Sequence, residues 1–328
     1  MSTPLKAPRK LQMTVIGPVL ALIVLIIAGA LMNPNFLAWD NVTNVLARSA
    51  FIGIIAVGMT FVITAGGLDL SVGSMAAFIA GLMILVMNSA LPSMGVGLPL
   101  VLLGIGVALL AGLVAGLVNG LLITRLGIEA FIVTLGSMGI YRSLVTWLAD
   151  GGTLSLYFNL RSFYQPVYYG GIFGISWPII VFAVIAVIGE VVMRSTAFGR
   201  HCAAIGSNDQ VAKYSSVRVA RVRLITYAAL GLLVGVATIM YVPRLGSASS
   251  ATGVLWELEA IAAVIIGGTV LKGGFGRVWG TVIGVLILTL IGNILNLTDF
   301  VSPYLNGAIQ GAIIVLAVVL QREGKPAG

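Results

Sequence analysis

Residues 66–74 read Gly-Gly-Leu-Asp-Leu-Ser-Val-Gly-Ser and lie between two apolar runs, Phe51–Ala65 and Val72–Met87. Inside a bilayer, a glycine-rich break is tolerated only where protein or a water-filled cavity surrounds it, because every backbone amide must be hydrogen-bonded. An ionisable group at that depth costs about 2.5–3.5 kcal/mol on insertion scales, and such groups mark pathways or hinges. Asp69 is therefore the first candidate for a functional carboxylate.

Two roles are open for Asp69. Its carboxylate could cap the helix that starts near Ser71 or pair with a basic residue, or it could contact a solute directly. Other polar residues within apolar stretches are Ser71, Asn119, Arg142, Asn293 and Glu190, with Glu129 at the start of a stretch. The candidates for a translocation pathway or hinge are Gly66, Gly67, Asp69, Ser71, Gly73, Asn119, Arg142, Gly267 and Gly268.

Composition places the chain among membrane proteins. Its 328 residues are 59% hydrophobic and 9% charged, with a mean hydropathy of +1.11. Each helical span needs about 20 apolar residues, so a chain of this length holds about ten spans and leaves almost nothing for an extramembrane domain. We therefore predict one all-α, polytopic domain over residues 1–328, with glycine-rich breaks in its hairpins. The single Cys202 excludes an internal disulfide framework.

Hydrophobic runs predict the individual spans. They lie near 12–32, 49–66, 70–88, 98–123, 128–148, 176–193, 224–242, 256–271, 278–297 and 304–321. The first run follows three basic residues and resembles a secretory signal, but it is longer than a signal core and nine further spans follow it. We therefore expect it to remain as a span.

Loop charges predict the orientation, since cytoplasmic loops carry an excess of Lys and Arg. With a cytoplasmic N-terminus, three of the eighteen Lys and Arg residues lie outside, namely Arg48, Arg161 and Arg244, and Arg142 lies within a span. The other fourteen are cytoplasmic: Lys6, Arg9, Lys10, Arg125, six residues in 194–223, Lys272, Arg277, Arg322 and Lys325. An even number of spans then gives cytoplasmic tails at 1–11 and 322–328. The net charge of +8 thus indicates the orientation of the chain in the membrane rather than nucleic-acid binding.

Two glycine stripes have helical spacing. Gly112, Gly116 and Gly120 repeat every four residues, and so do Gly276, Gly280 and Gly284. Small residues at this spacing let helix backbones approach closely in lipid. The stripes predict packing within one bundle or, as the alternative, a subunit interface.

The longest polar stretch is 194–223, with six basic residues and the single acid Asp209. Residues 208–214 can form a short helix with Asn208 or Asp209 as its N-cap. The stretch is either a solvated loop or a docking element for a cytoplasmic partner. His201 and Cys202 have no second Cys or His nearby, so no metal site is expected.

A second glycine cluster occupies Glu257–Thr281. Neither this cluster nor the rest of the chain contains Gly-Lys-Ser/Thr, so the sequence has no P-loop and we expect no ATP hydrolysis by this chain. Glu257 and Glu259 adjoin Trp256, which places them near the outer membrane interface.

Three segments together carry a resemblance: AVGMTFVITAGGLDLSVGS at 56–74, FGRHCAAIGSN at 198–208 and EAIAAVIIGGTVLKGGFGRVWGT at 259–281. From about Asn44 to Leu320 the chain resembles the ribose-type permease subunits of bacterial ABC importers for pentoses, hexoses and related polyols. It departs from that family at Val211–Val217, where a double alanine and Ser-Gly-Ile are usual.

The resemblance implies an importer of several parts in the bacterial inner membrane. A periplasmic sugar-binding protein delivers solute to two permease copies, identical or homologous, and a cytoplasmic ATPase with tandem cassettes binds ATP and Mg²⁺. The permease itself then has no catalytic residue, metal or cofactor, and it need not hold the solute tightly. Coupling to the ATPase is expected at Gly199, Arg200, Ala204, Gly206, Asn208, Ala212 and Ser215.

Other classes remain open at this stage. A related importer for branched-chain amino acids or nucleosides would differ in solute competition. A stand-alone carrier or channel would work without ATP, and a membrane-embedded enzyme would need a clustered nucleophile, base or metal set. The sequence does not name the sugar.

Overall fold

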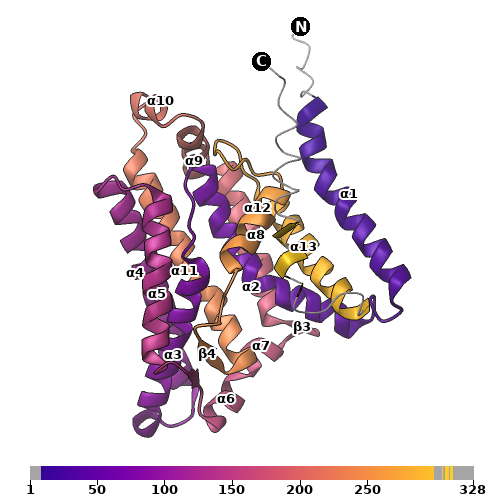
Figure 1. Cartoon of the computed structure of the whole chain (residues 1–328), viewed down its shortest axis with the longest axis vertical. Coiled ribbons are helices and arrows are strands. Elements are labelled where there is room, and N and C mark those ends of the chain that lie inside the picture. Colours follow the sequence, from indigo (N-terminus) through magenta and orange to yellow (C-terminus); the bar gives the residue numbers. More distant parts are fainter. Residues whose placement is uncertain (1–8, 299–304, 306, 310, 313–328) are drawn as a thin grey trace.

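The computed structural model describes residues 9–298, 305, 307–309 and 311–312. The chain is an all-α helical bundle with four very short strands (Figure 1). Among the described residues, seven helices are long and apolar enough to cross a membrane. They are α2 (Trp39–Thr64), α3 (Val72–Met94), α4 (Leu98–Arg125), α5 (Ala130–Leu148), α8 (Trp177–Ser195), α11 (Val219–Leu245) and α13 (Val278–Thr298).

Two further helices correspond to predicted spans. Helix α1 (Arg9–Met32) coincides with the predicted span 12–32, and α12 (Trp256–Ile266) has eleven residues. The predicted span 304–321 lies largely outside the described residues. The all-α, multi-pass architecture is thus confirmed.

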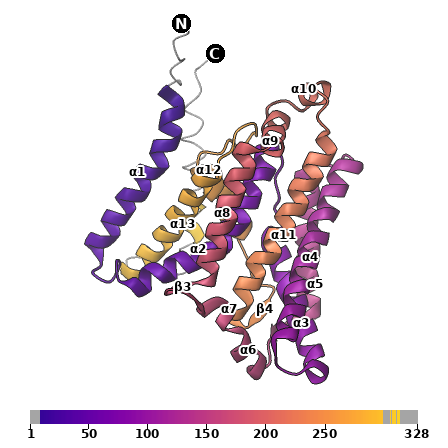
Figure 2. The same ribbon diagram turned by 180° about the vertical axis from the view of Figure 1, so that it is seen from behind.

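The remaining elements lie at the two ends of the bundle. Helices α9 (Ala197–Ser207) and α10 (Asp209–Tyr214) lie at one end, which we call the α10 end, together with the start of α1 (Figures 1 and 2). The opposite end, the α6 end, carries α6 (Phe158–Tyr164) and α7 (Pro166–Tyr169). Two antiparallel strand pairs complete the fold: β1 (Thr153–Ser155) with β4 (Ser247–Ser249), and β2 (Gly171–Ile172) with β3 (Ile175–Ser176).

Helix α2 forms the centre of the bundle. It packs against α8, α11, α12 and α13, and its residues from Phe51 to Thr64 are almost all buried. It begins at Trp39, ten residues before the predicted span at 49–66. The added turns contain the polar residues Asp40, Asn41, Asn44 and Arg48. Because the span was predicted from apolar residues, this polar part of the helix was not included.

Both glycine stripes pack inside this chain. A methyl group on Gly112 would overlap Gly231 O of α11, and one on Gly116 would overlap Tyr227 O. In the second stripe, a methyl on Gly284 would overlap Ala263 O of α12. Most of the stripe glycines therefore serve close α4–α11 and α12–α13 contacts, as the prediction of bundle packing requires, while Gly276 precedes α13 and lies against Thr64 of α2.

The predicted span 256–271 is wrong in length. Helix α12 ends at Ile266 because Gly267 caps it and Gly268 adopts φ +89°. At about 1.5 Å per residue, eleven residues reach roughly 16 Å, about half of the hydrocarbon thickness. Helix α12 is therefore a broken-span element, which starts after a non-helical approach from β4.

Candidate functional site

Asp69 lies in the non-helical segment between α2 and α3 and is completely buried. Its Oδ1 accepts hydrogen bonds from Ser71 N at 2.8 Å and Ser71 Oγ at 2.6 Å. Ser71 directly precedes α3, so the carboxylate satisfies a backbone donor at the start of that helix. The carboxylate thus orders the residue before α3, and among the described residues its hydrogen-bond donors are Ser71 and Asn119. Among the described residues, no ion pair with a basic side chain was found for Asp69.

Asn119 of α4 extends this contact to two further helices. Its Nδ2 donates to Ser71 Oγ at 3.0 Å and to Asp69 Oδ2 at 3.3 Å. Ser137 Oγ of α5 donates to Asn119 Oδ1 at 2.6 Å. The four buried side chains form one polar network, which fixes the start of α3 between α4 and α5. Because its polar atoms are paired, the network avoids the cost of unsatisfied groups in a low-dielectric interior.

The start of α3 meets the residues that lead into the broken-span helix α12. A methyl on Gly73 of α3 would overlap Gly253 O, in the approach to α12, and crowd Glu257 Oε2. That Glu257 oxygen is buried without a hydrogen-bond partner among the described residues. Nearby, Arg142 Nη1 of α5 donates to Ser250 O and Thr252 O, each at 2.6 Å. Arg142 thus anchors the approach to α12 to the wall formed by α5.

A second junction lies at the α10 end and consists of backbone contacts. A methyl on Gly206 of α9 would overlap Thr64 O at the end of α2 and Gly274 N in the α12–α13 hairpin. Gly274 N itself donates to Thr64 O at 3.0 Å. A methyl on Gly273 would lie 2.9 Å from the Gly206 Cα and 3.0 Å from that of Gly66. We call Thr64, Gly66, Gly206, Gly273 and Gly274 the glycine junction.

The glycine junction joins all three segments that carried the sequence resemblance. Gly66, Gly273 and Gly274 have φ of +75°, +87° and +85°, a conformation that favours glycine. Gly66 and the hairpin therefore cannot accept ordinary side chains, and Gly206 must lack one for steric reasons. Among the predicted hinge glycines, Gly67 lies in the same turn, while Gly267 packs against Gly280 of α13.

Other intramembrane polar residues hold helices together. Glu190 Oε2 of α8 accepts hydrogen bonds from Val278 N at 3.1 Å and Trp279 N at 3.2 Å, so it caps the start of α13. Asn293 and Asn41 exchange two side-chain hydrogen bonds, at 2.8 and 3.1 Å. Sequence reasoning did not find these partners, because they are distant in the chain.

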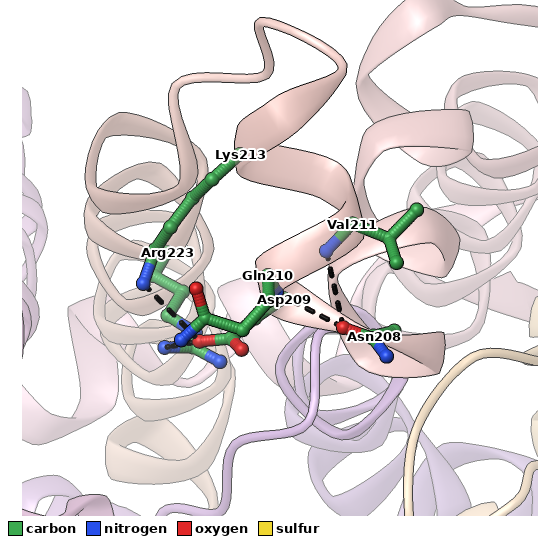
Figure 3. Close-up of polar contacts among 6 residues, drawn as sticks. All are labelled: Asn208, Asp209, Gln210, Val211, Lys213 and Arg223. Carbon is green, nitrogen blue, oxygen red and sulfur yellow. Dashed lines mark hydrogen bonds and ion pairs between the residues drawn. The ribbon is translucent and has the colours of Figure 1, made fainter.

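The short helix α10 forms as predicted, with Asn208 as its N-cap. Asn208 Oδ1 accepts from Gln210 N at 3.0 Å and Val211 N at 3.1 Å (Figure 3). Asp209 forms ion pairs with Lys213 at 3.6 Å and Arg223 at 3.8 Å, and the latter fastens α10 to α11. Exposed pairs of this kind contribute little stability individually. They do orient α10 at the tip of the molecule.

The predicted coupling residues divide into two groups. Gly199 and Ala212 are buried, and Gly206 packs into the glycine junction. The exposed members are Arg200, Ala204, Asn208 and Ser215. Sequence reasoning missed Val211 and Tyr214, which are exposed apolar residues three positions apart on α10; Tyr214 is 88% exposed. Together these side chains give the α10 end a mixed apolar and basic surface.

Cys202 belongs to the buried face of α9. Its side chain is buried, and burial raises the pKa of the thiol to about 12. Among the described residues, no group of three potential metal-ligating His, Cys, Asp or Glu side chains was found.

The chain is a helical membrane bundle with glycine-rich breaks between α2 and α3 and between α12 and α13. The family model described as "Branched-chain amino acid transport system / permease component" matches residues 41–318. The chain belongs to this permease family.

Curated relatives are similar over almost their full length. The ribose import permease of Bacillus subtilis (strain 168) is 40% identical over 310 residues, covering 94% of this chain and 92% of the relative. The ribose import permease of Haemophilus influenzae is 35% identical, covering 92% and 90%. The L-arabinose transport system permease of Escherichia coli (strain K12) is 33% identical, covering 93% and 90%.

Substitutions at Asp69 should separate capping from solute contact. Asn also caps helices, so we expect Asp69→Asn to keep most uptake per inserted permease. Asp69→Leu leaves the donors of Ser71 and Asn119 unpaired, at a cost of about 1–3 kcal/mol each, and should lower folded yield. Uptake normalised to membrane-inserted protein checks both. Strong loss of normalised uptake in Asp69→Asn, at wild-type abundance, would instead indicate solute contact.

Gly206→Ala should disable transport. The added methyl overlaps backbone atoms that cannot rotate away, and overpacking of this kind costs about 1–3 kcal/mol. We expect α9 to shift from the glycine junction and uptake to fall, with the protein still in the membrane. Gly292→Ala is the matched control, because a methyl there meets no atom within 4 Å. Equal uptake by both variants would mean that transport does not depend on the close packing of the glycine junction.

Proposed function

We propose that the chain is the transmembrane permease of an ATP-binding cassette importer for a pentose or a related sugar, located in the bacterial cytoplasmic membrane. The observation that carries this proposal is the 40% identity to a ribose import permease across more than nine-tenths of both chains. The family description refers to branched-chain amino acids, but the relatives compared above are named for sugars. An importer for amino acids is therefore the second candidate.

Partners supply the parts that this chain lacks. The sequence contains no P-loop, so ATP and Mg²⁺ would bind to a separate ATPase with tandem cassettes. A periplasmic binding protein would deliver the sugar, and a second permease copy would complete the pathway. The exposed Val211 and Tyr214, flanked by basic residues, would contact the ATPase.

The glycine junction offers a mechanical route for coupling. A displacement of α9 by the ATPase would press on the end of α2 and on the α12–α13 hairpin, because Gly206 touches both through backbone atoms. Thr64 leads through residues 65–71 to the start of α3, and the hairpin leads to α12. Motion at the α10 end would thus reach the place where the start of α3 meets the approach to α12.

Orientation is proposed from charge and geometry together. The basic residues of 194–223 belong to α9, α10 and their flanking residues at the α10 end, and Lys272 and Arg277 belong to the hairpin that contacts Gly206 of α9. Helix α4, which ends at Arg125, and the start of α1 also lead to this end (Figure 1). Arg161, Arg244 and Arg48 belong to the opposite half. The positive-inside rule then makes the α10 end cytoplasmic. With the span at 304–321 as the tenth, both termini are cytoplasmic and residues 1–328 form one domain.

Cysteine labelling in a Cys202→Ala background tests this orientation. Tyr214→Cys should react only from the cytoplasm and Phe173→Cys only from the periplasm, since these side chains are 88% and 99% exposed at opposite ends. A membrane-impermeant maleimide is applied to intact cells and to inverted vesicles. Labelling of Tyr214→Cys in intact cells would reverse the proposed orientation.

Reconstitution tests the function itself. The permease is assembled in proteoliposomes with the ATPase and binding protein encoded beside it, and uptake of D-ribose, L-arabinose and L-leucine is measured with and without ATP. We expect uptake of a sugar only with ATP and the binding protein present. Leucine uptake would favour the second candidate, and uptake without ATP would indicate a stand-alone carrier.

A further inference from the structure

An apolar groove runs between α4 and α5 on the surface of the bundle. Both helices pack against α3 at one edge of the bundle, but they contact each other much less than either contacts α3 (Figures 1 and 2). The space between them has a volume of about 590 Å³. Its lining is aliphatic and aromatic apart from Ser137, whose hydroxyl is already bonded to Asn119. We call this space the α4–α5 groove.

The α4–α5 groove is long and open. On α4 its lining extends from Val107 to Leu122. At about 1.5 Å per residue this stretch reaches roughly 22 Å, which exceeds the ~15 Å depth of hydrocarbon in one leaflet. Leu110, Val114 and Ile140 line it and are 65%, 56% and 58% exposed. A groove of this length that is apolar and open to the bilayer fits an extended acyl chain.

An arginine lies on the groove face of α4 at the end of the groove. Val114, Val118 and Leu122 line the groove and precede Arg125 by eleven, seven and three residues. At 3.6 residues per turn these positions share one face, so Arg125 continues the row of lining residues by one turn. Arg125 is exposed and is the last residue of a helix that is long enough to cross the membrane. Its guanidinium therefore lies at the membrane surface.

Two further arginines lie at the same level on the neighbouring helix α11. The glycine contacts of α4 and α11 run in opposite directions along the two helices, and a methyl on Gly120 would lie 3.3 Å from Leu224 Cα. Arg125 follows Gly120 by five residues and Arg221 precedes Leu224 by three, so they lie roughly 8 and 5 Å beyond that contact. Arg218 lies one turn further, and both arginines of α11 are exposed. We call Arg125, Arg218 and Arg221 the basic mouth of the groove.

Carboxylates do not neutralise the basic mouth. Asp209 is paired with Lys213 and Arg223. The three arginines of the mouth form no ion pair within the part of the chain that the structure describes. Glu129, which precedes α5, is the nearest carboxylate along the chain from Arg125. Three guanidinium groups and this one carboxylate leave a net charge of +2.

We propose that the α4–α5 groove binds an anionic phospholipid, with one acyl chain in the groove and the phosphate at Arg125 and Arg221. A guanidinium donates two N–H groups at once to phosphate oxygens, and basic clusters beside membrane spans attract anionic headgroups. Charge complementarity selects this lipid, because a zwitterionic phospholipid would fill the groove equally well but would bring an ammonium group to the basic mouth. The proposal involves neither the solute nor the partner subunits, so it stands or falls separately from the proposed function.

A lipid at this position would fill the space that α4 and α5 leave between them. Its acyl chain would pack against Ser137 of α5, whose hydroxyl holds Asn119 of α4. It would also cover Tyr141, which stacks on Phe78 of α3 with 5.7 Å between ring centroids. The bound lipid would thus support the packing of α3, α4 and α5 around the buried Asp69 network.

Native mass spectrometry tests the headgroup contact. The full-length permease, delipidated in detergent, is titrated with palmitoyl-oleoyl phosphatidylglycerol and with the matching phosphatidylcholine. We expect the wild type to bind the anionic lipid more tightly and Arg125→Gln to weaken that binding about fivefold, since one arginine near an anionic headgroup contributes about that factor. Arg161→Gln, an exposed arginine at the α6 end, is the matched control and should bind as the wild type does. Equal affinity of the wild type for both lipids, or equal losses in both variants, would overturn the proposal.

A variant that fills the groove tests the acyl-chain contact. Val114→Trp should weaken binding of both lipids, whereas Leu31→Trp, at an 83% exposed position on α1, should not. Thermal unfolding without added lipid shows whether each variant is folded. Unchanged lipid binding by a folded Val114→Trp would overturn the placement of the chain in the groove.

Two other occupants give different results. With Val114→Cys in a Cys202→Ala background, disulfide-linked dimers in native membranes would show that a second copy of the chain covers the groove. Displacement of the bound phosphatidylglycerol by millimolar inorganic phosphate would show that the basic mouth takes a free anion. Either result would overturn the assignment to a phospholipid, and neither would affect the proposed function.

Discussion

Backbone hydrogen bonding at two helix breaks inside the bundle is the constraint on which the rest of the structure depends. Helix α3 begins after a non-helical segment, and its first donors would be unpaired in a dry interior. Asp69 accepts from Ser71 N just before α3, Asn119 of α4 donates to the carboxylate, and Ser137 of α5 donates to Asn119. Glu190 of α8 accepts from the first two N–H groups of α13. The two buried acids Asp69 and Glu190 therefore lie at the starts of helices, where backbone N–H groups need hydrogen-bond partners.

Close backbone contact is the second organising feature. Where a glycine touches a carbonyl or an amide of another element, no side chain lies between them to absorb a displacement. The glycine junction has this property across α2, α9 and the α12–α13 hairpin, whereas the surface of α10 carries large exposed side chains. The molecule therefore combines exposed large side chains on α10 with an inner contact made of backbone atoms. That combination fits the proposed coupling, in which an ATPase displaces α9 and α10 and the displacement reaches the interior of the bundle.

Much of the site could be predicted from the sequence because its signals are local. The N-cap at Asn208 follows from residue type and position, and the glycine stripes follow from spacing along one helix. Asp69 was identified because a charge among apolar residues is conspicuous. The partners Glu190 with Val278, or Gly206 with Thr64, could not be found in this way, since they depend on how distant segments pack. The length of α12 was misjudged because apolar character continues through the glycines that end the helix.

The sequence by itself determined the class of protein, the order of the spans that the structure describes, and the family, since hydrophobicity, charge bias and three motifs are all properties of the linear chain. Only the tertiary structure decided that those three motifs meet at one junction, that the start of α3 meets the approach to α12, and that α4 and α5 leave an apolar groove between them that ends near Arg125. The physical reason is that close approach depends on which surfaces pack together. A glycine looks the same in the sequence whether it lies against a carbonyl or faces lipid, and only the fold distinguishes the two positions.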